Sequence, residues 1–255
     1  MKQAGCTFRS TRRTTNWAGV PAGISPPPPP ARLAGITACT WAMTPCLAAS
    51  TIWRRMPQQA MPTELRATPI AGVWELVGQP FSDHRGAFLN GFRAQDPAFA
   101  KAWGERPIAQ VNLSSTEAVG TVRGLHLQAP PHSEAKLVRC LRGRVWDVAV
   151  DLRPGSATLG CWHAAELSPA AGNALLIPEG CAHGFQVLQV GSELLYLHSG
   201  AWVPEAETGV HCCDPQLAIT WPLPPVGLSE RDARLPGLDQ LHLATDGNPA
   251  DPRLP

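Results

Sequence analysis

The side chains best suited to chemistry in this 255-residue sequence are two histidines and two basic residues near them in the chain. His126 follows Arg123 and precedes Lys136, and His183 lies further along. Histidine suits general base catalysis because its unperturbed pKa, about 6.5, lies near neutral pH. Neighbouring cations bind an anionic substrate and stabilise the negative charge of an enolate. A pocket that held these four residues would favour removal of a proton next to a carbonyl group.

A single histidine on a strand is more often a core residue than a catalytic one, so the spacing around each must decide. The segment that contains His183 resembles the second motif of metal-binding cupins. Cupins are small jelly rolls whose two motifs supply three His and one Glu to a metal. Four positions of that motif match, and Val187 stands where the motif has Asn. The matching residues are Gly172, Pro178, Gly180 and His183.

The first cupin motif matches at Gly120 and His126 but departs where metal ligands are expected. Gln128 replaces the second His, and Lys136, which is separated from Gly143 by six residues, replaces the Glu. An ammonium group at a ligand position repels a divalent cation. The sequence therefore predicts a site that has no metal and that uses a fixed organic cation instead.

Two other residues, His132 and Glu134, could restore a ligand set, but their spacing is wrong for one face of a strand. A metal-dependent cupin, such as a dioxygenase or small-sugar isomerase, stays open as an alternative. So does a cupin that binds without catalysis, although His126 and its predicted partners argue against that function.

Beyond these spacings, many separate runs between about residues 66 and 240 resemble the dTDP-4-dehydrorhamnose 3,5-epimerase family, in the family's order. The resemblance covers none of the first 60 residues. The runs are Arg123-Gly-Leu-His126-Leu-Gln128, Lys136-Leu-Val-Arg-Cys140, Asp147-Val-Ala-Val-Asp151-Leu-Arg153, Ile177-Pro-Glu-Gly-Cys-Ala-His183-Gly-Phe185, Pro204-Glu-Ala-Glu207, Asp214-Pro215, Trp221-Pro222 and Ser229-x-x-Asp232.

The resemblance implies three catalytic residues. His126 matches the base, and Asp232 matches the carboxylate that orients it, with Asp147 as the rival for that role. Tyr196, the only tyrosine of the chain, matches the acid that returns a proton to the opposite face of the sugar.

Ten further positions are implied to bind the nucleotide sugar, and two of them depart from the family. Asn90 stands where the family usually has Glu, and Trp202 stands where a Tyr stacks on thymine. An indole stacks at least as well but loses the phenol's hydrogen bond. The positions are Arg85, Asn90, Gln110, Asn112, Arg123, Lys136, His183, Trp202, Glu207 and Arg231.

The implied reaction is epimerisation at C3 and C5 of dTDP-4-keto-6-deoxy-D-glucose, in dTDP-rhamnose biosynthesis. Epimerisation at one carbon, or of a related keto-sugar nucleotide, is the close alternative, because the same base would serve it. The family also implies no cofactor and a homodimer whose early strands, with Arg85, cross to the partner subunit.

The pattern of the chain from residue 70 onward fits such a fold. Strand-like runs at 137–141, 145–152, 174–177, 184–190 and 193–198 alternate with turns. Helix starts are few: one over Asp96–Trp103, and Ser229-x-x-Asp232, which resembles an N-cap. We expect an all-β, cupin-type jelly-roll barrel with a few short helices.

Composition divides the chain. Residues 1–60 hold seven basic residues, no acidic one and the run Pro26–Pro30, whereas the rest carries a net charge of −6. We expect 1–60 to be a disordered or mis-assigned N-terminal extension, with a transit peptide as the alternative. We expect 61–243 to be the epimerase domain and 244–255 a flexible tail.

Charge and cysteines limit the partners and the compartment. The mildly acidic body gives no electrostatic footprint for nucleic acid, and no apolar stretch is long enough to span a membrane. Eight cysteines without a C-x-x-C pair indicate reduced thiols in a cytoplasmic protein. Adjacent Cys212 and Cys213 are expected to pack rather than react.

Overall fold

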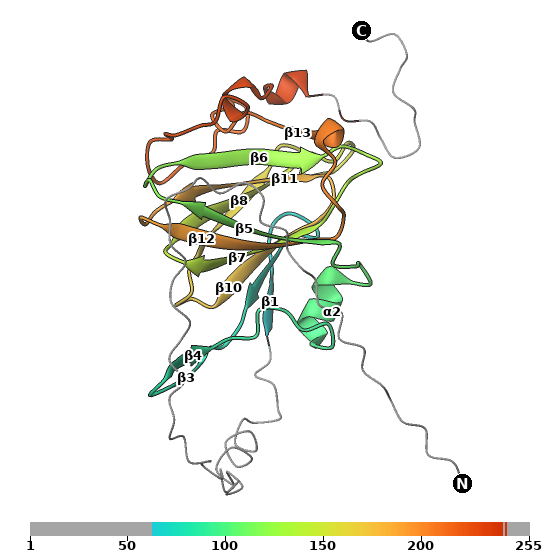
Figure 1. Cartoon of the computed structure of the whole chain (residues 1–255). Helices are drawn as coiled ribbons and strands as arrows, with labels where there is room; N and C mark the ends of the chain where they lie inside the picture. The colour runs from blue at the N-terminus through green and yellow to red at the C-terminus, as the bar shows by residue number, and fades with distance from the viewer. Residues whose placement is uncertain (1–62, 242, 244–255) are drawn as a thin grey trace, which may run out of the picture. The chain divides into compact units, whose positions relative to one another are not determined.

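The computed structural model describes residues 63–241 and 243, which fold as strands with few helices (Figure 1). The expectations for 1–60 and 244–255 lie outside the described residues. The strands are β1 (Glu64–Ala67), β2 (Trp74–Val77), β3 (Phe81–Asp83), β4 (Gly86–Phe88), β5 (Gln110–Thr116), β6 (Val122–Gln128), β7 (Lys136–Arg142), β8 (Val145–Asp151), β9 (Trp162–Leu167), β10 (Asn173–Ile177), β11 (Cys181–Val187), β12 (Ser192–His198) and β13 (Glu207–Gly209). The helices are α2 (Pro97–Trp103) and the 3-10 turns η1 (Pro204–Ala206), η2 (Asp232–Arg234) and η3 (Leu238–Gln240).

Two antiparallel sheets form the body. One has six strands in the order β1-β2-β10-β7-β12-β5, and the other has five in the order β13-β6-β11-β8-β9. Figure 1 shows the two sheets as successive layers. This arrangement confirms the all-β jelly roll with a few short helices that the sequence predicts.

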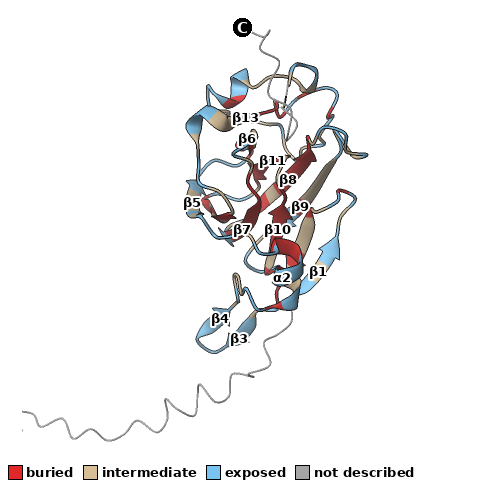
Figure 2. Ribbon diagram, turned by 90° about the vertical axis from the view of Figure 1, so that its right-hand side faces the viewer, coloured by how far each residue is buried: buried red, intermediate tan, exposed pale blue. Residues whose placement is uncertain are grey.

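An apolar cluster fills part of the space between the sheets, and both outer faces are also partly covered. Residues of β7 to β12, such as Val138, Phe185 and Leu194, form the central cluster. Helix α2 covers the outer face of the six-stranded sheet through Phe99 and Trp103. The segment after β13 covers the outer face of the five-stranded sheet. Strands β7, β8, β10 and β11 are accordingly the buried ones in Figure 2.

Because both outer faces of the sheets are covered, the expectation of a polar, exposed strand face is wrong for β8. The alternation of 145–152 predicts a strand with an apolar and a polar face, but Asp147, Ala149 and Asp151 are as buried as Val148 and Val150. One face of β8 points into the barrel and the other lies under the C-terminal segment, so both must be buried.

Most predicted elements are present with small shifts. Helix α2 begins where predicted, because Asp96 Oδ1 accepts the N–H of Ala98 at 2.9 Å. The strand predicted at 184–190 instead spans Cys181–Val187. Strand β1 precedes residue 70, where the alternation was expected to begin.

Strands β6 and β11 approach closely beside the predicted site. His126 and His183 are cross-strand partners, and a bulge follows on β6, where two residues oppose Gly184. Gly124 has φ of +125°, and a Cβ there would lie 2.5 Å from the Cα of Gly184. Glycine at 124 is therefore required both for the backbone conformation and for the approach.

The hairpin of β3 and β4 stands apart from both sheets. Every residue of the two strands is exposed, including Phe81 and Phe88 (Figure 2). Strand β5 is one of the two edges of the six-stranded sheet within the described chain, opposite β1, and its Val111 and Leu113 are exposed. Among the described residues, no helix is long and apolar enough to cross a membrane.

Candidate active site

A cavity of about 880 Å³ is lined by residues from both sheets. Strands β5, β7 and β12 contribute from the six-stranded sheet, and β6, β11 and β13 from the five-stranded sheet. All predicted site residues except Arg85 and Asn90 line it. Those that do are Gln110, Asn112, Arg123, His126, Lys136, His183, Tyr196, Trp202, Glu207, Arg231 and Asp232.

The predicted base is paired with a carboxylate. His126 Nε2 lies 2.8 Å from Asp232 Oδ1. Asp232 Oδ2 accepts the N–H of Gly124 at 3.4 Å, and its own N–H donates to Ser229 Oγ at 3.0 Å. Burial alone would raise the pKa of Asp232, but the hydrogen bond and charge of His126, with help from Ser229 and Gly124, hold that pKa below its ordinary value. Because a carboxylate only accepts, this contact assigns the proton to Nε2 and the lone pair to Nδ1. The Nη2 of Arg231 also lies 3.2 Å from Nε2.

The second histidine has its own aspartate. His183 Nε2 lies 2.8 Å from Asp147 Oδ1, and Asp147 is fully buried. Burial raises the pKa of Asp147, and His183 opposes part of that rise. The structure thus pairs Asp232 with His126 and Asp147 with His183.

Tyr196 enters the cavity from β12, in the sheet opposite to His126. Its hydroxyl lies 3.1 Å from Ser114 Oγ, and its ring packs edge-on against His183 with centroids 5.9 Å apart. Burial raises the pKa of Tyr196 above its ordinary value. The phenol therefore keeps its proton at neutral pH, as a general acid must.

The floor of the cavity holds a cluster of which sequence reasoning predicted only Lys136 as a substrate contact. Lys136 Nζ lies 3.3 Å from Glu134 Oε1 and donates to the backbone oxygen of His126 at 3.2 Å. Glu134 Oε2 accepts from Gln128 Nε2 at 3.0 Å and lies 3.5 Å from His198 Nδ1. Neither Glu134 nor His198 belongs to a motif that singles it out as a substrate ligand.

Four of the residues predicted to bind the nucleotide sugar, Gln110, Trp202, Glu207 and Arg231, form the rim. Trp202 Nε1 and Arg231 both donate to Glu207 Oε2, at 2.8 and 2.6 Å. Gln110 Oε1 accepts the backbone N–H of Trp202 at 2.9 Å. Half of Trp202 is exposed, at 53%. An exposed indole that is fixed at its nitrogen offers a flat surface for stacking.

Two predicted residues lie away from this cavity. Arg85 is in the turn of the β3–β4 hairpin, where its guanidinium pairs with Asp83 at 2.6 Å. Asn90 is exposed just after that hairpin. Neither reaches the cavity of its own chain, so their predicted contacts require the partner subunit and stay predictions.

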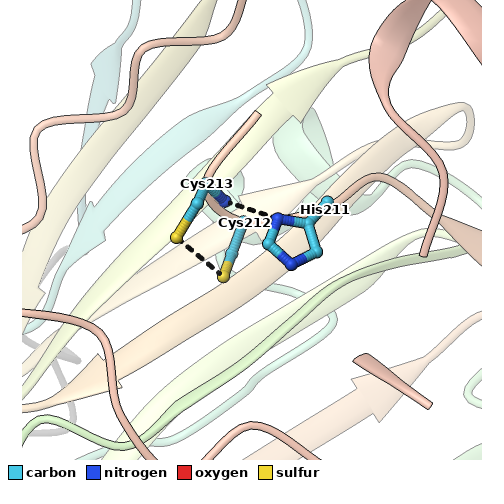
Figure 3. A group of neighbouring side chains, drawn as sticks. All are labelled: His211, Cys212 and Cys213. Atoms are coloured by element: carbon cyan, nitrogen blue, oxygen red, sulfur yellow. Dashed lines mark hydrogen bonds between the residues drawn. The ribbon is translucent and has the colours of Figure 1, made fainter. Parts of the chain in front are cut away.

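One group of three donor side chains in the described part of the chain could hold a metal ion, and it lies outside the cavity. The donor atoms of His211, Cys212 and Cys213 lie within 4.8 Å of one another (Figure 3). The two sulfurs are 3.8 Å apart, and His211 Nδ1 already accepts the N–H of Cys213. Burial raises the pKa of Cys212 to about 12. That thiol is therefore protonated and packed, as expected, whereas Cys213 is exposed.

Comparison with known proteins points to one family. Residues 67–240 match the family described as dTDP-4-dehydrorhamnose 3,5-epimerase. A dTDP-4-dehydrorhamnose 3-epimerase of Streptomyces niveus is 45% identical over 170 residues, which are 66% of this chain and 80% of that protein. A dTDP-4-dehydrorhamnose 3,5-epimerase of Sinorhizobium fredii is 40% identical over 173 residues, 68% of this chain and 88% of that protein.

A solved structure supports the same family. The crystal structure of dTDP-6-deoxy-D-glucose-3,5-epimerase from Legionella pneumophila in complex with dTDP-4-keto-L-rhamnose is 35% identical, with a TM-score of 0.68. The similarity covers 72% of this chain and 98% of that one.

Proposed function

Because the chain belongs to the dTDP-4-dehydrorhamnose 3,5-epimerase family, we propose that it epimerises dTDP-4-keto-6-deoxy-D-glucose at C3 and C5 to dTDP-4-keto-L-rhamnose. One observation carries the proposal. A histidine–aspartate pair and a protonated tyrosine face one cavity from opposite sheets, His126 on β6 and Tyr196 on β12.

In this mechanism His126 removes the proton from the carbon next to the C4 ketone. Asp232 fixes the ring and stabilises the imidazolium that forms, since a carboxylate with a lowered pKa stays charged. The electrons move into the carbonyl to give an enolate, whose negative charge the buried ammonium of Lys136 stabilises. Tyr196 donates a proton to the same carbon from the other side, which inverts its configuration. No step needs a metal or a cofactor.

Residues at the rim account for binding of the nucleotide. The diphosphate of a dTDP-sugar is anionic, and Arg123 and Arg231 line the cavity. Trp202 offers its exposed ring to the thymine. These contacts would hold the substrate while the sugar ring turns between the two epimerisations.

Solvent deuterium tests the reaction. In D2O the product should carry deuterium at both C3 and C5, because each proton that His126 removes is replaced from an exchangeable group. Turnover coupled to the following reductase should fall to background in His126→Ala. No exchange at either carbon by the wild-type protein would refute the proposal.

Epimerisation at C3 alone is the second candidate. It is favoured by the Streptomyces niveus relative, whose name specifies a 3-epimerase and which is 45% identical. The same base and acid would serve it. Deuterium at C3 without deuterium at C5, at long incubation, would establish this candidate in place of the first.

The proposal includes a homodimer in the cytoplasm. The exposed aromatic hairpin of β3 and β4 and the free edge of β5 are surfaces that a second copy would cover. Arg85 and Asn90 would then reach the partner's cavity. The absence of disulfides among the five described cysteines supports a reducing compartment. Light scattering on the purified protein checks the dimer, and a monomer at working concentration would contradict it.

A further inference from the structure

Glu134 is a buried carboxylate beneath the cavity. Only 4% of its side chain is exposed. Its two oxygens contact three side chains from three elements: Lys136 of β7 at 3.3 Å, His198 of β12 at 3.5 Å and Gln128 of β6 at 3.0 Å. A charge buried to this degree is retained only where it has partners.

The contacts of Glu134 continue to the rim along two routes. His198 Nε2 lies 3.3 Å from Asn112 Nδ2, and Asn112 Oδ1 accepts from Gln110 at 2.9 Å. Gln110 and Gln128 then accept the backbone N–H groups of Trp202 and Val203, at 2.9 and 2.5 Å. Glu134 therefore connects the ammonium at the floor to the segment that presents the indole.

Lys136 depends on this carboxylate for its charge. Burial lowers the pKa of Lys136, and the nearby carboxylates, first Glu134 and then Glu207, oppose that fall. The other titratable groups that line the cavity from elements packed around β7 are Arg123 and His126 on β6, His183 on β11, and Tyr196 and His198 on β12. None of these is an anion at neutral pH. The remaining carboxylates that line the cavity already have partners, Glu207 with Arg231 at 2.6 Å and Asp232 with His126 at 2.8 Å.

We propose that Glu134 is a positioning residue that keeps Lys136 a cation at the floor of the active site and, through His198 and Gln128, fixes the rim above it. The inference rests on the proposed function for its catalytic consequence, because only an enolate reaction needs that cation. The charge relation itself needs no substrate, so it can be tested separately.

Lysine NMR gives that separate test. The chain has three lysines, Lys2, Lys101 and Lys136, so protein labelled with 13C at the lysine ε-carbon shows few signals, which Lys2→Arg and Lys101→Arg assign. In Glu134→Gln, which keeps the size of the side chain but removes the charge and one of the two acceptor oxygens, Lys136 should titrate lower by about one pH unit or more. Lys101 should not change. Equal midpoints for Lys136 in both proteins would overturn the proposal.

Two further variants make the comparison specific. Glu134→Asp keeps the charge and should leave the Lys136 midpoint near that of the wild type; a shift as large as in Glu134→Gln would overturn the proposal. Glu193→Gln removes a half-exposed carboxylate that pairs with Arg142 at 3.5 Å, and it should leave the Lys136 midpoint unchanged.

If Glu134→Gln does not fold, adding Lys136→Met should restore folding by removing the unpaired ammonium. Continued failure to fold would overturn the pairing.

The activity readout follows. In Glu134→Gln the alkaline limb of the kcat/KM profile should move to lower pH by the amount that NMR measures, with activity recovered on the acid side of that limb. A structural defect would lower the whole profile without moving the limb, and that result would overturn the positioning role. If the wild-type protein does not turn over the keto sugar, the proposed function fails, while the NMR titration still decides the role of Glu134.

Discussion

Two histidine–aspartate pairs lie side by side at the cavity, with the same distance but different surroundings: Asp232 lines the cavity, whereas Asp147 is buried behind His183. His126–Asp232 and His183–Asp147 both measure 2.8 Å, and the two histidines are cross-strand neighbours. The side chain of His126 is 19% exposed and that of His183 only 7%.

The carboxylates respond to their surroundings in opposite directions. Asp232 gains bonds from Gly124 and Ser229, and its pKa is lowered. Asp147 is fully buried, its Oδ2 has no partner among the described residues, and its pKa is raised. The hydrogen-bond donors around the acid and its degree of burial, rather than the histidine–aspartate distance, therefore decide which pair can hold an imidazolium.

The largest expected effect separates the two histidines. His126→Ala should lower kcat about 1,000-fold, since it removes the general base, whereas His183→Ala should lower it about 10-fold. Coupled turnover measures both, and calorimetry with dTDP should show that each variant still binds. Equal losses of kcat would break the distinction between the pairs.

Tyr196→Phe sharpens the comparison, because the tyrosine ring packs on His183 while its proposed chemistry belongs with His126. Loss of the hydroxyl should lower kcat about 100-fold and leave the thermal midpoint unchanged, since the phenyl ring keeps its packing. Ser114→Ala, which removes only the partner of the hydroxyl, serves as the control, with less than about a 10-fold loss. Unchanged turnover in Tyr196→Phe would show that another group is the acid.

Substitution of the two aspartates should produce a smaller difference in kcat than substitution of the two histidines that they orient. Asp232→Asn should lower kcat about 50-fold, because the neutral amide no longer stabilises the imidazolium of His126. Asp147→Asn should lower it no more than about 5-fold. Both are measured at the same pH under saturating substrate. A larger loss for Asp147→Asn would assign the base to His183.

The smallest effect is on stability, and its sign differs between the pairs. The folded-state pKa of Asp232 lies below its unfolded value, so its contribution is present above pH about 4 and is lost as pH falls through the folded pKa. The folded-state pKa of Asp147 lies above its unfolded value, so stability falls as pH rises from about 4 through the folded pKa.

Urea unfolding at pH 4 and pH 7 checks this. At pH 7, Asp232→Asn should lower the free energy of unfolding by about 1–2 kcal/mol. Asp147→Asn should change it by less than about 1 kcal/mol and should compare more favourably with the wild type at pH 7 than at pH 4. Changes of the same sign and size in both variants would remove the electrostatic difference between the pairs.

Local patterns predicted the parts of the molecule that depend on local spacing. Asp96 marks the start of α2, and the motif spacings bring His126 and His183 into one cavity. Contacts that join distant segments were not predictable in this way. Nothing near Glu134 in the sequence reveals that it meets His198, 64 residues later, across β7 and β12.

The burial of side chains was the other property that the sequence pattern could not predict. The alternation of β8 could not show that both of its faces are covered, because the second cover comes from a segment more than 60 residues away. The sequence also could not decide whether Asp147 or Asp232 is the partner of His126. Both are acids near a histidine in the family pattern, and only the fold shows which is in contact.

The close approach of Gly124 to Gly184 has a consequence for engineering. Main-chain atoms, rather than side chains, set the separation of the two histidines at this contact. The backbone thus fixes the spacing of the two histidines, whereas the half-exposed ring of Trp202 is a side chain that can be exchanged. Libraries that seek altered nucleotide preference should vary Trp202 and keep both the glycine pair and the residues that join the rim to Glu134, so that new specificity is selected without re-optimising the proton transfer.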